Sequence, residues 1–105
     1  MTDLSELDPL IHAPMRLRIT STLAALAPGD AVSFTRLRDL LDTTAGNLIT
    51  HLRKLDDADY IDATKRANAT YYALTDTGRT AYANYKTTLQ HWLNQVPTEP
   101  PHLHE

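Results

Sequence analysis

TTAGNLITHLRKLDDADYI, residues 43–61, carries the clearest structural pattern in this chain. Its apolar residues recur at helical spacing and make one stripe: Ala45, Leu48, Leu52 and Leu55. This spacing predicts a helix over residues 44–58 with that stripe packed inward. Thr43 or Thr44 can cap the helix by accepting from its free N–H groups, and Gly46 leaves the first turn open to an approaching phosphate.

The other faces of this predicted helix are polar, and they carry Asn47, Thr50, His51, Arg53 and Lys54. In the major groove of DNA, Asn suits adenine, whereas Arg or Lys suits guanine. The segment is therefore a candidate recognition helix. A charged outer face is also the default for an amphipathic surface helix, so this segment alone leaves both interpretations open.

Length and composition describe an ordinary globular domain. The chain has 105 residues, of which 42% are hydrophobic and 22% charged, so we expect one domain with a real core. It has no cysteine, which excludes disulfides, thiolate metal ligands and cysteine nucleophiles. No apolar run approaches the roughly 20 residues of a membrane span, and the start MTDLSELD lacks the basic head of a signal peptide. We expect a cytoplasmic protein without a membrane partner.

The net charge of −3 at first argues against a nucleic-acid partner, because Lys and Arg drive binding to phosphate. The acidic residues are unevenly placed, however. Residues 1–12 and 97–105 hold five of the 13 acidic residues and none of the 10 basic ones, so the segment between them is net basic. The charge distribution thus permits DNA binding.

Upstream of the candidate recognition helix, the pattern predicts three further helical segments. Residues 2–12 have a helical spacing interrupted by proline, which indicates a short leading helix. Pro14 suits the first turn of the next helix, which we expect to run to about Ala27 before the turn Pro28-Gly29-Asp30. Its core stripe is Met15, Ile19, Leu23 and Leu26.

The third of these helices begins at Ser33. The two residues before it, Ala31-Val32, are too few for an independent strand but could add one pairing to a small sheet. Arg36 and Arg38 point outward in this helix, and its expected inward residues are Phe34, Leu37, Leu40 and Leu41. A short turn then leads to the candidate recognition helix. Two helices so joined, the second polar outside, have the layout of a helix-turn-helix.

After residue 59 the apolar period changes to two. Residues 60–65 and 70–74 both alternate, which predicts a β-hairpin whose turn is made by residues 66–69. Asn68 tolerates the left-handed conformation that such a turn needs. Lys65 and Arg66 lie near the tip, where an Arg can enter a narrow minor groove. A hairpin tip also needs solvated residues, so the two cations have that simpler explanation as well.

Thr75 is the expected cap of a final helix that runs to about Val96. Its regular apolar seam is typical of a coiled coil and predicts a dimer contact, although the helix could instead fold back on its own domain. The expected dimer interface adds the leading helix to this seam: Leu4, Leu7, Ile11, Tyr82, Tyr85, Leu89, Trp92 and Val96. Residues 1–96 would form one domain, and the proline-rich residues 97–105 a disordered tail.

In this order the segments LIHAPMRLRITSTLA, SFTRLRDLLDTTAGNLITHLRKLDDADYI and TYYALTDTGR resemble the small winged helix-turn-helix transcriptional regulators related to the MarR and ArsR groups. The resemblance covers residues 8–90. It implies a mainly α fold with a small β-hairpin and a long C-terminal dimerisation helix. It also implies a homodimeric regulator that binds double-stranded DNA, with residues 44–58 in the major groove and the wing, residues 65–69, at the minor groove.

The expected DNA contacts come from the second helix of the motif, the recognition helix and the wing: Ser33, Thr35, Arg36, Arg38, Thr44, Gly46, Asn47, Thr50, His51, Arg53, Lys54, Lys65, Arg66 and Asn68. The family usually has Gly where this chain has Asp59. We therefore expect Asp59 either to adopt the left-handed cap or to end the helix differently.

Other functional classes have weaker signals. No nucleophile elbow, phosphate loop or paired-carboxylate setting is identifiable, so we expect no enzymatic activity. His91, His102 and His104 raise the possibility of a metal sensor, but the last two lie on the proline-rich tail, so we expect no metal site and no cofactor. A winged-helix module that binds proteins is the main alternative. The sequence identifies no effector.

Overall fold

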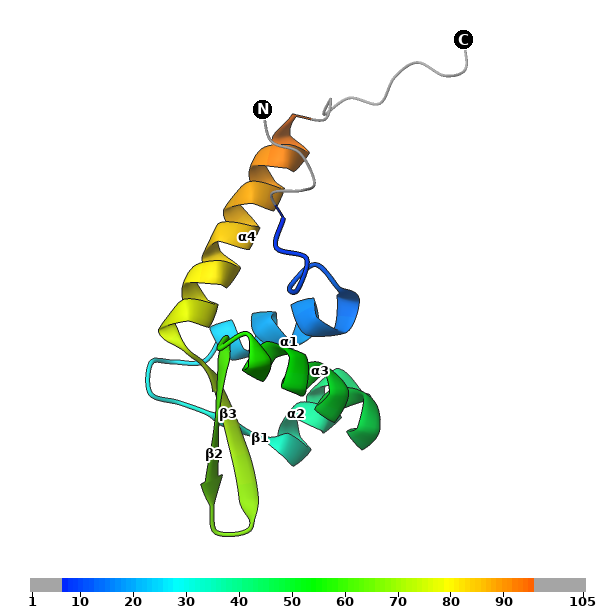
Figure 1. The fold of residues 1–105 in the computed structure, drawn as a ribbon, viewed down its shortest axis with the longest axis vertical. Helices are drawn as coiled ribbons and strands as arrows, with labels where there is room; N and C mark the ends of the chain where they lie inside the picture. The colour runs from blue at the N-terminus through cyan, green and yellow to red at the C-terminus, as the bar shows by residue number, and fades with distance from the viewer. Residues whose placement is uncertain (1–6, 96–105) are drawn as a thin grey trace.

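The computed structural model describes residues 7–95, which form four helices and a small sheet (Figure 1). In chain order the elements are α1 (Pro14–Ala24), β1 (Val32–Ser33), α2 (Phe34–Leu41), α3 (Ala45–Asp57), β2 (Ile61–Arg66), β3 (Ala69–Leu74) and α4 (Asp76–Asn94). The predicted fold class, mainly α with a β-hairpin and a long last helix, is confirmed. Among the described residues, no helix is long and apolar enough to cross a membrane.

The core lies where α1, α2 and α3 meet the sheet. The α3 stripe of Leu48, Leu52 and Leu55 is at most 2% exposed and packs with Ile19 and Leu23 of α1. Each such leucine side chain stabilises the fold by about 1.5–3 kcal/mol relative to an exposed one. The helical spacing therefore located the main core correctly.

Two apolar residues expected in the core lie outside it. Ala45 is exposed because it stands in the first turn of α3, ahead of the buried part of the stripe. Leu40 is 52% exposed. Leu37 and Leu41, one turn apart, occupy the inward stripe of α2, and Leu40 falls on the flank beside them.

The sheet is antiparallel with strand order β1-β3-β2. Val32 and Ser33 of β1 pair with Tyr72 and Tyr71 of β3. The short strand expected at Ala31-Val32 therefore forms one residue later in the sequence, at Val32–Ser33. In the hairpin, Arg66 pairs with Ala69, which leaves a loop of only Ala67 and Asn68. Ala67, with φ 53°, has the left-handed conformation, so the prediction that Asn68 would take it was wrong. Two-residue hairpin loops need positive φ at their first position, and the pairing register puts Ala67 there.

The segment before α1 forms turns over residues 7–13, where a helix was expected; residues 2–6 lie outside the described range. Pro9 lacks an N–H, and the side chain of Asp8 accepts a hydrogen bond from the Leu10 N–H at 2.8 Å, which closes a local turn in place of continued helix. Leu7 and Ile11 of this segment nevertheless stay buried, packed against Tyr85 of α4.

A tight junction joins the end of α3 to the start of α4. Asp59 adopts the left-handed cap with φ 64°, one of the two outcomes expected for it, and the Tyr60 N–H then bonds to the Leu55 carbonyl at 2.9 Å. Thr75 caps α4 as expected by accepting from the Gly78 N–H, and its hydroxyl donates to the Asp59 carbonyl at 2.6 Å. A Cβ on Gly78 would lie 2.0 Å from the Tyr60 carbonyl oxygen, so only glycine permits this approach.

Candidate nucleic-acid interface

The N-terminal half of α3 presents an open polar face. Thr44 caps the helix by accepting from the Asn47 N–H at 3.1 Å, so of the two expected caps Thr44 is the one used. Thr43 instead accepts a hydrogen bond from the Asn47 side-chain amide at 2.9 Å. Thr50 donates back to the Gly46 carbonyl at 2.9 Å. Asn47 is exposed, and within the described residues its side-chain oxygen and second N–H make no other hydrogen bond, which suits a bidentate contact.

This open face is opposite the buried leucine stripe and contains five of the expected DNA contacts, all exposed: Gly46, Asn47, Thr50, Arg53 and Lys54. A Cβ added at Gly46 would meet nothing within 4 Å, so the backbone of the first turn is accessible. A helix N-terminus carries partial positive charge from its free N–H groups. Two cations and an unshielded N-terminal turn together give α3 the electrostatics of a phosphate-contacting helix.

His51 is the expected reading residue that lies off this open face. It is half-buried on the side of α3 that faces α1, where Arg16 Nη1 is 3.0 Å from its Nδ1. Burial, the Arg16 charge and the Lys54 charge lower the pKa of the His51 imidazole below 6.5. Sequence reasoning missed Arg16, because its position off the α1 stripe carries no sign of a partner on α3.

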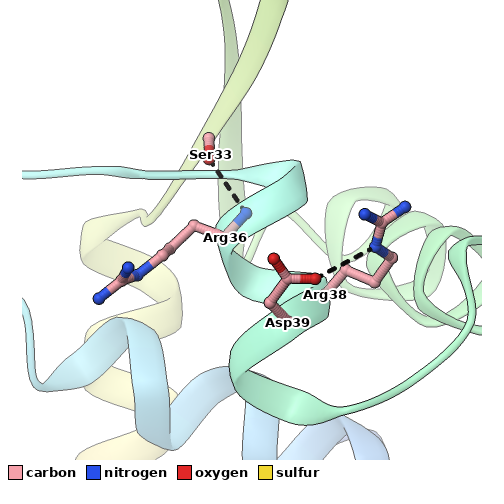
Figure 2. A network of polar contacts seen from close by, with 4 residues as sticks. All are labelled: Ser33, Arg36, Arg38 and Asp39. Carbon is pink, nitrogen blue, oxygen red and sulfur yellow. Dashed lines mark hydrogen bonds and ion pairs between the residues drawn. The ribbon is translucent and has the colours of Figure 1, made fainter.

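The start of α2 is held by Ser33, whose hydroxyl accepts from the Arg36 N–H at 3.1 Å (Figure 2). Figure 2 also shows the Arg36 and Arg38 guanidinium groups on opposite sides of α2, as residues two apart on a helix must be. Arg38 lies 3.6 Å from the Asp39 carboxylate, in an ion pair exposed to solvent. These two arginines therefore cannot face the same surface, although both were expected to contact DNA.

A hollow of about 330 Å³ lies between α2, α3 and the hairpin tip. It brings Thr35 and Asn68, both expected DNA contacts, to one place, and its other lining residues are Phe34, Ile49, Ala69, Thr70 and Tyr72. Thr35 and Arg38 are one turn apart on α2, so Arg38 is the arginine on the hollow's side. Sequence reasoning missed Thr70 and Ile49, since the contact between hairpin and helix that gathers them has no local signal.

The two wing cations point to opposite faces of the hairpin, because neighbouring residues in a strand alternate. Lys65 pairs with Thr70, on the face that lines the hollow. Arg66 lies on the other face, where its guanidinium carbon is 5.3 Å from the centre of the Tyr71 ring. This cation–π contact draws Arg66 back along the strand, away from the tip.

The expected dimer residues divide into four groups. Leu7, Ile11 and Tyr85 are at most 3% exposed within the single chain, because they pack against one another. The expectation that these three residues contact a partner was therefore wrong. Tyr82 donates a hydrogen bond to Ser21 of α1 at 2.9 Å. Leu4 and Val96 lie outside the described residues. Leu89 and Trp92, in the second half of α4, stay partly exposed.

Among residues 7–95, no three His, Cys, Asp or Glu side chains gather in a geometry that could hold a metal ion. His91 lies on α4, where its Nε2 is 3.2 Å from the Gln95 side-chain amide. His102 and His104 lie outside the described residues.

Comparison with known families gives a match over residues 15–93 to one described as the winged helix DNA-binding domain. A transcriptional regulator homologue protein from Pyrococcus horikoshii OT3 is 25% identical, with a TM-score of 0.75 over 82% of this chain and 86% of its own. The S. aureus MepR–DNA complex has a TM-score of 0.74 at 15% identity, over 87% of this chain and 75% of MepR. HlyU from Vibrio cholerae N16961 has a TM-score of 0.62 at 20% identity, over 83% and 86%. No curated protein matches significantly.

Proposed function

Because this chain belongs to the winged helix DNA-binding domain family, we propose that it is a transcriptional regulator that reads double-stranded DNA sequence-specifically as a homodimer. The observation that carries the proposal is the open face of α3: a capped N-terminus, an unshielded Gly46, and polar or basic side chains opposite a buried stripe. Such a helix inserts its N-terminal half into the major groove. The expected resemblance to small winged-helix regulators is confirmed.

Each part of the surface has a role in this proposal. Asn47 and Thr50 read base edges, and Arg53 and Lys54 contact phosphates. The hollow between α3 and the hairpin receives the sugar–phosphate backbone that runs from the major to the minor groove, with the Thr35 and Thr70 hydroxyls as donors. The hairpin tip then lies at the minor groove. For Arg66 to enter that groove, it must leave the Tyr71 ring.

The dimer in this proposal forms through the second half of α4. Leu93 is 48% exposed, and a surface hollow of about 550 Å³ on that part of the helix is lined by Leu93 and Leu89. In Figure 1 this part of α4 extends away from α2, α3 and the hairpin. A second copy packed there would leave both α3 faces free for DNA.

The decisive experiment begins with selection of bound sequences from a random DNA pool. On the selected site, Asn47→Ala should relax the preference at one base pair, by roughly 5- to 150-fold, with little change in salt dependence. Lys54→Ala and Arg38→Ala should weaken binding to all sequences alike and reduce the salt slope by about 1 each.

Arg36→Ala is the matched control for Arg38→Ala, because Arg36 points to the other side of α2 and should leave binding nearly unchanged. Failure of the selection to enrich any sequence, together with salt-independent binding to a protein partner, would instead support the protein-interaction module.

A further inference from the structure

Arg16 joins three parts of the protein through one guanidinium group. It extends from α1, its Nε donates to the Leu10 carbonyl at 2.6 Å, and its Nη1 lies 3.0 Å from His51 Nδ1. Leu10 belongs to the turns before α1, and His51 belongs to α3. A planar guanidinium held at two points has little freedom to turn, so its contact with the imidazole is also held in place.

The chemistry of this contact determines where the imidazole proton lies. A guanidinium has five N–H donors and no acceptor, so His51 Nδ1 must accept through its lone pair. In the neutral ring the proton is then on Nε2. Within the described residues, Nε2 has no hydrogen-bond partner, and the ring is only half-buried. His51 therefore presents an N–H donor beside the open face of α3.

His51 is one helical turn beyond Asn47, which places the two side chains next to each other on α3. On the basis of the proposed function, we propose that Arg16 is a positioning residue that holds His51 as a neutral Nε2–H donor, and that this donor reads a hydrogen-bond acceptor on a base edge in the major groove. Suitable acceptors are the purine N7 and the guanine O6 or thymine O4 oxygens. Nothing in the sequence of α3 alone assigns this role to Arg16.

Burial and the charges around the ring keep it in the neutral form. Burial lowers the pKa of the ring most, and the charges of Arg16 on α1 and Lys54 on the next turn of α3 lower it further. A second proton would place an imidazolium beside the guanidinium and remove the acceptor that the guanidinium uses. The neutral donor thus persists to lower pH than in a free histidine.

The first measurement uses DNA-free protein. The His51 pKa, followed by NMR of the imidazole ring, should lie below 6.5 in the wild type and rise toward 6.5 in Arg16→Ala. Arg18→Ala, which removes an exposed cation from the same helix, should leave it unchanged. An unchanged His51 pKa in Arg16→Ala would overturn the contact itself.

The second measurement compares binding to the selected site and to its single-base variants. His51→Ala should reduce discrimination at one base pair by roughly 5- to 150-fold. Arg16→Lys keeps the charge but cannot hold both contacts, so it should lose preference at that same base pair with an unchanged salt slope. The Arg16→Lys, His51→Ala double variant should lose no more than His51→Ala alone, because both remove one shared contact.

Two results would overturn the reading role. In the first, Arg16→Lys binds like the wild type, whereas Arg16→Ala weakens all sequences equally; Arg16 would then be a phosphate contact. In the second, His51→Ala keeps every base preference while Asn47→Ala does not, in which case the proposed function stands without this inference. If the wild type selects no sequence at all, the proposed function fails and the reading role with it, although the pKa measurement still decides the Arg16 contact.

Discussion

At the scale of single residues, three non-glycine residues of the described chain have positive φ, and each ends an element. Asp42, with φ 51°, ends α2, and Asp59, with φ 64°, ends α3. Aspartate tolerates this conformation because its short polar side chain can bond locally. Ala67 in the hairpin loop, with φ 53°, has no such compensation. The wing is therefore held in a turn that its own sequence does not favour.

We expect Ala67→Gly to stabilise the protein by a few tenths to about 1 kcal/mol. Glycine removes the left-handed penalty, and the greater freedom of the unfolded chain offsets part of the gain. Urea unfolding measures the change. Ala69→Gly is the control: Ala69 is in β3, in extended conformation, so this change should destabilise. Equal effects of the two substitutions would contradict the assignment of strain to Ala67.

The His51 pKa makes stability depend on pH. Its folded-state pKa is lowered from 6.5, so between that lowered value and 6.5 the unfolded chain binds more protons than the folded one. The free energy of unfolding should therefore fall as the pH drops through this window, and the contribution should be fully present above pH 6.5. The measurement is the difference in unfolding free energy between wild type and His51→Gln against pH. A flat difference from pH 7 to 5 would contradict the lowered pKa.

At the scale of elements, a tight junction fixes α3 and α4 relative to each other. Thr75 bonds to both Asp59 and Gly78, and Gly78 lies directly against the Tyr60 carbonyl. Tyr60 also donates a hydrogen bond of 2.5 Å to the Asp8 carboxylate, which raises the pKa of the Tyr60 hydroxyl to about 12. The end of α3 is thus tied to the start of α4 and to the segment before α1.

Two glycines of the chain should respond in opposite ways to alanine. Gly78→Ala should destabilise by about 1–3 kcal/mol, because its Cβ would overlap the Tyr60 carbonyl and force α4 away from α3. Gly46→Ala should stabilise by about 0.5–1 kcal/mol, since its Cβ enters open space within a helix. Thermal unfolding measures both.

Gly46→Ala also tests the proposed DNA contact of α3, because the added methyl group stands where the backbone of α3 is open. We expect it to weaken DNA binding while it stabilises the fold. A Gly46→Ala variant that is more stable and binds equally well would show that no phosphate approaches the first turn of α3.

At the scale of the whole molecule, the two halves of the apolar seam of α4 differ in burial. Tyr82 and Tyr85, in its first half, pack against α1 and the segment before it. Leu89 and Trp92, in its second half, stay partly exposed, and Leu93 beside them is 48% exposed. The first half of the seam therefore folds back on its own domain, whereas a dimer contact through the second half stays a prediction.

We expect Leu93→Glu to convert the dimer to monomers, because it places a carboxylate in the apolar contact. Binding to a full site should then fall far more than binding to a half-site, and wild-type half-sites should lie about 10 base pairs apart or a multiple of that. Sedimentation velocity measures the oligomeric state. Leu40→Glu, at an exposed leucine of α2, is the control and should leave it unchanged. A Leu93→Glu protein that sediments like the wild type would refute this interface.

The elements of this fold follow from local sequence patterns, and the fold class could be predicted from them. These patterns act between residues at most a few positions apart, so the sequence alone shows them. They are the helical stripes, the alternation in the hairpin, and the caps Ser33, Thr44 and Thr75. The open face of α3 was predictable for the same reason: once Leu48, Leu52 and Leu55 face inward, Asn47 and Lys54 must face outward.

Only the tertiary structure decided which functional residues meet. Arg16 reaches His51 across 35 positions of sequence, and Ile11 covers Tyr85, which turned an expected partner surface into core. The hairpin register, which pairs Lys65 with Thr70, decided that Lys65 and not Arg66 shares the face of the hollow. Such contacts depend on how whole elements pack against one another. The local periodicity of the sequence does not indicate them, because the residues involved are far apart along the chain. The residues of the open helix face were therefore accessible to sequence reasoning, whereas the neighbours that orient them were not.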